Sequence, residues 1–209
     1  MKKVCILINS MSGGGAERVM KLVAENIDPD IYQPCFVFLE DIQTYKVRED
    51  IPQTILCKDR SSPLWMFIAL WRFCSWLKQN KPDFILSALT RAHIINIISK
   101  IFFPTSKRIL SVHTDAFVVY AKRPVFCALL KYLFSFADGA HFVSKGLEWS
   151  WRTQAHFRQP SKVIFNPVDL ERIKKALLDD LPQGEQEFFN AKVIVHAGRL
   201  VPEKNQMLL

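Results

Sequence analysis

Short apolar runs alternate with amphipathic stretches along most of this chain. The apolar runs predict strands over residues 3–8, 33–40, 54–57, 83–89, 107–112, 139–144 and 162–165. Apolar residues at helical spacing predict helices over residues 15–27, 64–79, 92–102, 124–137, 146–157 and 170–178. Strands that alternate with helices are typical of βαβ units and a parallel sheet. Because the strands are apolar at successive positions, helices are expected on both faces. The pattern therefore predicts an α/β fold with a doubly wound, mainly parallel sheet.

The end of the chain has a different pattern. Residues 192–197 are apolar and predict a further strand, a polar turn follows, and Asn205 could cap a helix that begins at Gln206. These elements cannot bury their own surface, because a folding unit needs at least two packed layers. Residues 179–190 have the polar, Pro- and Gly-bearing composition of a linker. We therefore expect one domain over residues 1–178, a linker over 179–190, and over 191–209 the start of a second domain that is truncated.

Composition narrows the class of protein. Apolar residues make up 49% of the chain, which is enough for a globular core. No apolar run approaches the roughly 20 residues that span a bilayer, and the apolar N-terminal stretch is too short for a signal peptide. The five cysteines form no Cys-x-x-Cys pair, and we expect buried free thiols in a cytoplasmic protein. The His and Cys positions show no ligand spacing, so no metal site is expected. We also expect no cofactor.

The formal net charge of +8 is compatible with three kinds of partner: nucleic acid, an anionic membrane or phosphorylated small molecules. The alternative is that the charge serves solubility alone. No recognised motif supports nucleic-acid binding. Residues 64–78 are unusually aromatic and apolar most of the way round a helix, and residues 122–134 combine basic residues with a thick apolar face. Both segments either pack on the sheet or make peripheral contact with the anionic inner face of the plasma membrane, and the sequence leaves both readings open.

A glycine-rich loop follows the first predicted strand. Gly13, Gly14 and Gly15 allow the backbone to approach a ligand closely, and the helix N-terminus behind them favours phosphate. The alternative is a tight turn without a ligand. Arg18 stands where a dinucleotide fingerprint needs its third glycine, although Glu40 ends the second strand, where a ribose-binding acid would lie. A nicotinamide-dependent dehydrogenase is therefore weakened as an interpretation but not excluded.

Ligands of such sheets bind beyond the carboxyl ends of the strands. His113 directly follows the strand over 107–112 and could donate a hydrogen bond to a sugar hydroxyl or stabilise developing charge. A lone histidine at such a position is more often structural. Asp115 could orient this imidazole, but no Ser or Cys nucleophile is paired with it by spacing, so a hydrolase triad is not supported.

Other polar residues follow the remaining strands. Arg91, Ser144 and Asn166 each come just after a predicted strand, where most polar residues are loop groups or helix caps. Arg199 and Lys204 follow the last predicted strand and lie five residues apart. Two cations in this arrangement could neutralise a diphosphate, the arginine through forked hydrogen bonds and the lysine as a point charge.

Four segments in this order resemble the glycosyltransferases of family 4 with the GT-B fold. They are residues 12–18, 111–113, 166–169 and 198–205, so the resemblance covers the whole chain. The glycine loop is especially similar to that of bacterial enzymes that build polysaccharides and lipid-linked oligosaccharides. The resemblance implies two Rossmann-like domains that face a cleft, with acceptor bound by the N-terminal one and nucleotide-sugar by the other. It implies sugar transfer with retention of configuration and without a required metal, and this chain would be the N-terminal half.

The resemblance also implies roles for individual residues. Gly13 and Gly14 would approach the donor diphosphate or the acceptor, and His113 would contact the donor sugar near the reaction centre. Arg199 and Lys204 would hold the diphosphate and stabilise the charge of the leaving group. The partners would be a nucleotide-sugar, most often a UDP-sugar in this family, and a glycan or polyprenyl-diphosphate-linked acceptor of cell-surface polysaccharide synthesis. The family's Glu-x7-Glu element is absent from the chain, so the alternative is a non-catalytic acceptor- or membrane-binding module.

Overall fold

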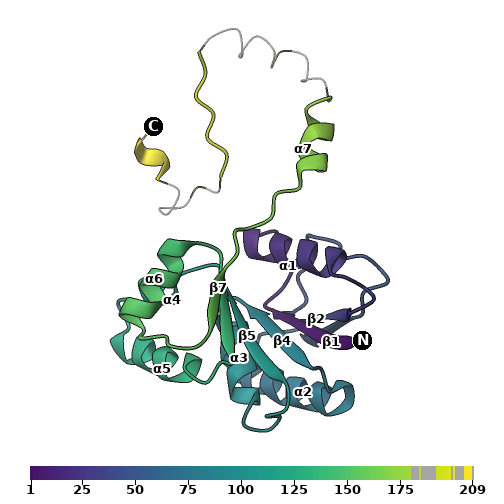
Figure 1. Ribbon diagram of the computed structural model, residues 1–209. Helices are drawn as coiled ribbons and strands as arrows, with labels where there is room; N and C mark the ends of the chain where they lie inside the picture. The colour runs from purple at the N-terminus through teal and green to yellow at the C-terminus, as the bar shows by residue number, and fades with distance from the viewer. Residues whose placement is uncertain (180–183, 185–191, 199, 201–204, 209) are drawn as a thin grey trace. The chain divides into compact units, whose positions relative to one another are not determined.

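A seven-stranded sheet in which all strands are parallel forms the centre of residues 1–167 (Figure 1). The strands are β1 (Lys2–Ile8), β2 (Tyr32–Glu40), β3 (Gln53–Cys57), β4 (Phe84–Ala88), β5 (Lys107–Val112), β6 (Gly139–Phe142) and β7 (Ser161–Val163). Their order is β3-β2-β1-β4-β5-β6-β7. The chain moves outward from β1 to β3 and then crosses back to place β4 beside β1. The strand order therefore reverses between β1 and β4, which is where open α/β sheets bind ligands.

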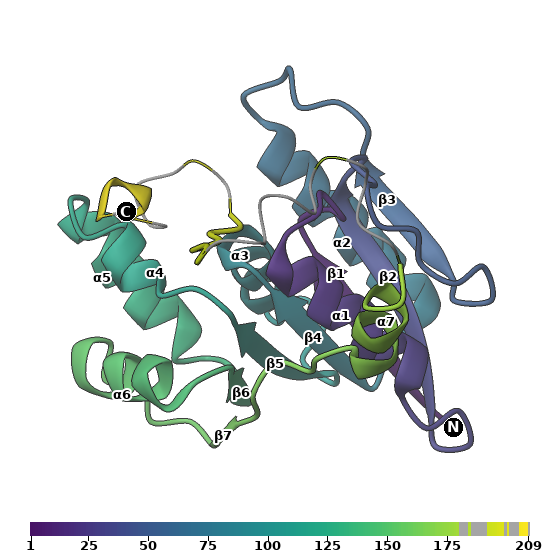
Figure 2. The same cartoon turned by 90° about the horizontal axis from the view of Figure 1, so that it is seen from above.

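Helices cover both faces of this sheet. They are α1 (Gly15–Asn26), α2 (Trp65–Asn80), α3 (Thr90–Ser99), α4 (Ala116–Val119), α5 (Pro124–Phe134) and α6 (Lys145–Gln154). Helix α1 packs Val19 and Met20 against Ile6, whereas α2 packs Phe73 against Leu7, the next residue along β1. Successive strand residues point to opposite faces. Figures 1 and 2 accordingly show α1 and the pair α2–α3 on opposite sides of the sheet.

An aromatic cluster fixes the far half of the sheet and its helices. Trp151 of α6 is fully buried, stacks on Phe134 of α5 with ring centroids 5.4 Å apart, and meets Phe117, Phe142 and Phe157 edge-on at 5.2, 5.5 and 5.7 Å. Each such aromatic pair contributes about 0.5–1.5 kcal/mol beyond its buried area. This cluster anchors the short helix α4 to α6 through the contact of Phe117 with Trp151.

The structure is a computed structural model that describes residues 1–179, 184, 192–198, 200 and 205–208. The chain divides into two units, Met1–Pro167 and Val168–Leu209. The second unit contains α7 (Leu170–Ala176) and the 3-10 helix η3 (Gln206–Leu208). No helix in these ranges is both long and apolar enough to cross a membrane.

The doubly wound parallel sheet predicted from the sequence is confirmed, and each strand and helix predicted within residues 1–178 is present with slightly shifted ends. Helix α4 was not predicted, because four residues are too few to show a helical period. The strand predicted over 192–197 is wrong, since these residues have no regular secondary structure and are exposed. A strand needs a neighbour for its backbone hydrogen bonds, and the described residues of the second unit provide none. The expected linker and second-domain start stay predictions.

Candidate functional site

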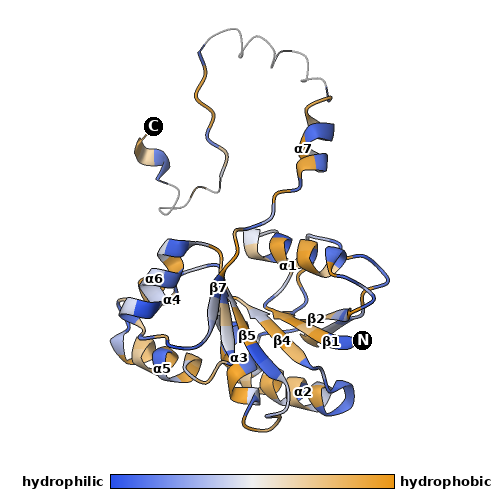
Figure 3. Cartoon of the chain, viewed as in Figure 1, coloured by the Kyte–Doolittle hydropathy of each residue, from blue (hydrophilic) through white to orange (hydrophobic). Residues whose placement is uncertain are grey.

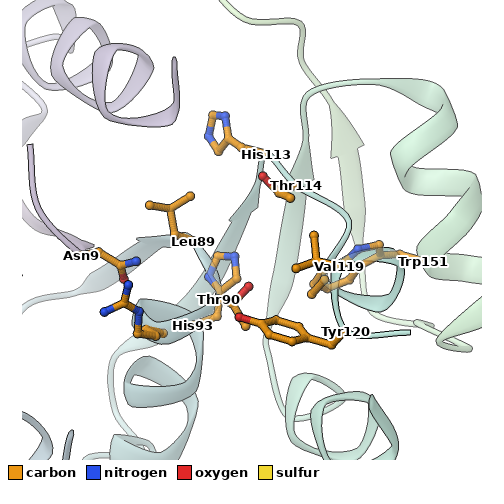
Figure 4. A pocket seen from close by; sticks show the side chains of 11 residues that line it. Asn9, Leu89, Thr90, His93, His113, Thr114, Val119, Tyr120 and Trp151 are labelled. Atoms are coloured by element: carbon orange, nitrogen blue, oxygen red, sulfur yellow. The ribbon is translucent and has the colours of Figure 1, made fainter. Parts of the chain in front are cut away.

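A cavity of about 210 Å³ lies at the point where the strand order reverses (Figure 4). Asn9 reaches it from the end of β1, Leu89 and Thr90 from the end of β4, and His113 and Thr114 from the end of β5. The remaining lining residues belong to the helices: Arg91, His93, Ala116, Val119, Tyr120 and Trp151. Polar groups from the ends of three neighbouring strands therefore converge on one cavity.

The junction between β4 and α3 carries backbone strain at the wall of this cavity. Leu89 has φ 74° and ψ 151°, a combination that side chains with a Cβ strongly disfavour and that costs about 1–3 kcal/mol. No side chain within the described residues caps α3, and the first helical hydrogen bond runs from the His93 N–H to the Leu89 carbonyl at 2.9 Å. The N–H groups of the first turn, beginning at Thr90, are thus free of backbone partners. They add the positive end of the helix dipole to this wall.

His93 is a buried, neutral histidine in the cavity wall. Its Nδ1 lies 2.9 Å from the Ser87 hydroxyl, which in turn accepts a hydrogen bond from Asn96 Nδ2 at 2.9 Å. Asn96 donates to Ser87, and the Ser87 hydroxyl has two acceptors in reach, His93 Nδ1 at 2.9 Å and the Ile109 carbonyl at 3.5 Å. Because the contact with His93 Nδ1 is much the shorter, we assign the Ser87 proton to it, and the His93 proton then resides on Nε2. Burial lowers the pKa of His93 to about 3, with the neighbouring His113 as the second cause. His93 therefore offers a neutral N–H donor near pH 7.

His113 is also neutral and is held by a second hydrogen-bonded group. Its Nε2 lies 3.0 Å from the Ser111 hydroxyl, and the same hydroxyl lies 2.9 Å from Nδ1 of His141. Nε2 of His141 lies 2.8 Å from the backbone carbonyl of Ile164. Burial lowers the pKa of His113 to about 4, and the adjacent His141 adds to the effect. The cavity thus has two uncharged imidazoles in its wall near pH 7.

Two arginines pair with one carboxylate beside the cavity, and one of them, Arg91, lines it. The buried carboxylate of Glu40, at the end of β2, pairs with Arg91 Nη1 at 2.5 Å and with Arg60 Nη1 at 3.0 Å. Both guanidinium groups lie over the Trp65 ring, at 5.6 Å for Arg91 and 5.8 Å for Arg60. One carboxylate for two guanidinium groups leaves an excess positive charge. Since two arginines already hold Glu40, it is not free to bind a ribose, which disfavours the dehydrogenase interpretation.

The glycine loop between β1 and α1 is tightly fastened. Gly13 has φ +97°, a conformation that other residues rarely adopt, and its carbonyl accepts a hydrogen bond from Tyr45 Oη at 3.1 Å. A Cβ at Gly14 would collide with the carboxylate of Glu17, which also accepts a hydrogen bond from Ser12 Oγ at 3.2 Å. The chain's own carboxylate therefore lies against the start of α1, where the sequence predicted phosphate.

The sequence-derived candidates divide into two groups. His113 and Arg91 line the cavity, as expected for residues that follow β5 and β4. The loop of Gly13 and Gly14, together with Gly15, which begins α1, does not line the cavity, although its neighbour Asn9 does. A Cβ at Gly15 would meet no atom within 4 Å, so this position is open.

The other candidates lie elsewhere. Ser144 is the N-cap of α6, where its hydroxyl accepts a hydrogen bond from the Leu147 N–H at 3.2 Å. Asn166 is exposed beyond the end of β7. Arg199 and Lys204 fall outside the described residues, so their roles stay predictions.

Asp115 does not orient His113. Its Oδ1 accepts a hydrogen bond from the Phe117 N–H at 2.9 Å as the N-cap of α4, and its Oδ2 accepts one from Ser150. The residue that sequence reasoning missed is His93, which lies one turn into α3. Within the ranges that the structure covers, no group of three or more His, Cys, Asp or Glu side chains is arranged to hold a metal ion.

Known glycosyltransferases are similar to this chain in sequence. Residues 13–172 match the sequence model of the family described as Glycosyltransferase Family 4. A curated relative from Campylobacter jejuni is 25% identical over 219 residues, which cover 100% of this chain and 58% of the relative. That protein is named N-acetylgalactosamine-N,N'-diacetylbacillosaminyl-diphospho-undecaprenol 4-alpha-N-acetylgalactosaminyltransferase.

Solved structures show the same fold. HepE of Anabaena in complex with UDP-glucose superposes with a TM-score of 0.72 at 19% identity, covering 100% of this chain and 56% of HepE. Sucrose-phosphate synthase of Thermosynechococcus elongatus gives a TM-score of 0.67 at 11% identity, covering 82% of this chain and 49% of that protein. The chain therefore spans about half the length of the proteins that it matches.

Proposed function

Because this chain belongs to glycosyltransferase family 4, we propose that it supplies the acceptor-binding, N-terminal half of a retaining glycosyltransferase. The donor is a nucleotide-sugar, with a UDP-sugar as the preferred choice, and no cofactor takes part. The acceptor is a glycan or a polyprenyl-diphosphate-linked sugar of cell-surface polysaccharide synthesis. The name of the Campylobacter relative includes a diphospho-undecaprenol acceptor, and HepE was solved with UDP-glucose, which supports these two partners.

The observation that carries this proposal is the pairing of neutral and positive groups around one cavity. His93 and His113 are uncharged near pH 7 and suit sugar hydroxyls, which both donate and accept hydrogen bonds. Arg91 and the uncapped N-terminus of α3 suit a phosphate group. A sugar joined to a diphosphate likewise has neutral hydroxyl groups at one end and negative charge at the other.

In the transfer, a bond forms between an acceptor oxygen and the anomeric carbon while the bond from that carbon to the diphosphate oxygen breaks. The proton of the acceptor hydroxyl passes to the departing diphosphate, which keeps its remaining negative charge. We propose that this chain binds and orients the acceptor sugar beside His113, where the resemblance implied the donor sugar, and offers Arg91 to the negative charge of the acceptor's diphosphate. Arg199 and Lys204 would stabilise the departing diphosphate.

A binding measurement tests this proposal on the 209-residue chain. The ligand is a short-chain prenyl diphosphate that bears an N-acetylhexosamine, titrated by calorimetry. Arg91→Gln should weaken binding about tenfold or more, because a hydrogen bond to a charged group is lost. Arg48→Gln is the matched control, since Arg48 is also paired with a carboxylate, that of Asp50, but does not line the cavity. Equal affinities for the wild type and Arg91→Gln would contradict the proposal.

A competing function is a non-catalytic acceptor- or membrane-binding module. Sugar transfer from UDP-sugars, measured for this chain and for a version extended by a second domain, distinguishes the two. The enzyme interpretation predicts transfer by the extended version, whereas the module interpretation predicts acceptor binding without transfer by either.

We also propose peripheral attachment to an anionic membrane on the cytoplasmic side. Leu64, the N-cap of α2, is followed at helical spacing by Phe67 and Trp71, which are 71% and 70% exposed. With Phe102 and Phe103 from the segment after α3, α2 borders an apolar groove of about 620 Å³. Figure 3 shows apolar colouring along α2 and α5. The free thiol state of the five cysteines supports a reducing compartment.

Helix α5 adds a second apolar stripe with positive charge beside it. Val125, Leu129 and Tyr132 are exposed on one side of this helix, and Lys122 and Arg123 lie just before its start. Apolar and aromatic side chains flanked by basic ones fit the surface of an anionic bilayer, where each nearby Lys or Arg contributes about 1 kcal/mol.

Vesicle sedimentation tests the attachment at low salt. Vesicles rich in phosphatidylglycerol should retain the protein, and phosphatidylcholine vesicles should not. Trp71→Ser should reduce retention, whereas Trp149→Ser, which removes a tryptophan of α6 that is 67% exposed, should not. Equal recovery from both kinds of vesicle would remove the idea.

A further inference from the structure

A line of hydrogen bonds runs across three adjacent strands to His113. It begins at the Ile164 carbonyl beyond β7, passes through His141 of β6 and Ser111 of β5, and ends at His113. Ser111 and His141 are direct partners in the parallel register of β5 and β6, so the sheet itself sets their distance. The strands β5, β6 and β7 are neighbours in the sheet (Figure 2).

The carbonyl at one end determines the direction of every bond in this line. The Ile164 oxygen can only accept a hydrogen bond, so Nε2 of His141 carries a proton. In a neutral imidazole the other nitrogen then has a lone pair, so Nδ1 of His141 accepts from the Ser111 hydroxyl. The Ser111 oxygen, having used its only proton, accepts from Nε2 of His113. His113 is left with its proton on Nε2 and a lone pair on Nδ1.

The lone pair on His113 Nδ1 is free for a ligand. No residue that the structure describes is hydrogen-bonded to Nδ1, and the His113 side chain lines the cavity. A nitrogen lone pair accepts from a hydroxyl but repels an oxygen that carries negative charge. His113 therefore favours the hydroxyl groups of a sugar phosphate over its phosphate group. The negative charge of the phosphate is then bound by Arg91 and the N-terminus of α3.

We infer that His141 is a positioning residue which, through Ser111, holds His113 as a hydrogen-bond acceptor and so selects a ligand that presents a hydroxyl there. This deepens the proposed function and rests on it for the identity of the ligand. It also changes the role that the sequence indicated, because His113 accepts a hydrogen bond from the sugar rather than donating one. His141 acts without touching the ligand.

The tautomer of His113 can be measured without any ligand. Long-range ¹⁵N–¹H spectra of the 209-residue chain at pH 7 distinguish the protonated ring nitrogen from the one with the lone pair. The expected result is a protonated Nε2 and an unprotonated Nδ1 in the wild type. Ser111→Ala and His141→Phe should each give a mixture of both tautomers, whereas Ser111→Thr, which keeps the hydroxyl, should restore the wild-type pattern. A purely structural role for Ser111 and His141 would leave the tautomer unchanged in the variants that fold.

Binding tests the selection of a hydroxyl. The two probes are a short-chain prenyl diphosphate that bears an N-acetylhexosamine and the same prenyl diphosphate without a sugar. Ser111→Ala should weaken binding of the first probe about 3- to 10-fold, as expected for one neutral hydrogen bond, and leave the second unchanged.

The outcomes separate this inference from the proposed function. A wild-type His113 protonated on Nδ1 would overturn the inference whatever binds. An equal loss of affinity for both probes in Ser111→Ala would also overturn it. Failure of the wild type to bind either probe would overturn the proposed function, and the hydroxyl selection with it, while the tautomer assignment would stand.

Discussion

Acidification from pH 7 to pH 5 should destabilise this protein through His93. Its side chain is 3% exposed, and burial lowers its pKa from 6.5 to about 3. A folded-state pKa below the unfolded value means that the stabilising effect is complete above about pH 6.5 and is lost as the pH falls toward 3. In that window the unfolded chain binds a proton that the folded chain does not.

The magnitude follows from the two pKa values. At pH 5 nearly all unfolded chains carry the His93 proton and very few folded chains do, so the difference amounts to about 1.5 pH units, or about 2 kcal/mol. At pH 7 the stability lost through this group is only about 0.2 kcal/mol. His93 alone should therefore lower the free energy of unfolding by about 2 kcal/mol between pH 7 and pH 5.

Urea denaturation followed by tryptophan fluorescence measures this effect at the two pH values and constant ionic strength. His93→Gln removes the titrating group, so the fall in unfolding free energy should be about 2 kcal/mol smaller than in the wild type, even though the variant is less stable at both pH values. His156→Asn is the control, because His156 is exposed in the folded chain and its φ of 53° suits asparagine. If His93→Gln and the wild type lost the same free energy on acidification, the assignment of a buried, neutral His93 would be refuted.

Two further predictions concern the frame around the cavity. Gly13→Ala should lower the free energy of unfolding by about 1–2 kcal/mol, because alanine is strained at φ +97°. Gly15→Ala, at an open helical position, should not lower it. Equal thermal midpoints for the two variants would contradict this prediction. Trp151→Ala should cost about 3–5 kcal/mol in urea denaturation, because it empties the centre of the aromatic cluster, and a loss below 1 kcal/mol would show that the cluster does not hold α4 to α6 together.

The sheet could be predicted because a strand that is buried on both faces has apolar residues at successive positions. The residues of β1 and β2 are apolar at successive positions, and helix α1 between them has one apolar side. The same apolar pattern led to the wrong prediction of a strand over residues 192–197. An apolar run indicates a tendency to be buried, but it does not supply the neighbouring strand with which to pair. Helix α4 left no signal, because its start depends on the single cap of Asp115 rather than on a repeating pattern.

The site could be predicted only in part. His113 and Arg91 were identifiable because the ends of parallel strands meet at one edge, and both follow a strand. His93 lies inside α3, and the sequence alone does not show which side of that helix faces the cavity. Ser111 and His141 are thirty residues apart and meet only through the register of β5 and β6, which no local pattern reveals.

The most direct test of the account observes the histidine ring signals of the 209-residue chain by NMR during titration with the prenyl-diphosphate N-acetylhexosamine. The account predicts that the signals of His93 and His113 move together with one dissociation constant, that the exposed His156 signal stays in place, and that Arg91→Gln weakens this constant about tenfold. Ring signals of His93 and His113 that stay still while the ligand binds elsewhere on the chain would contradict it.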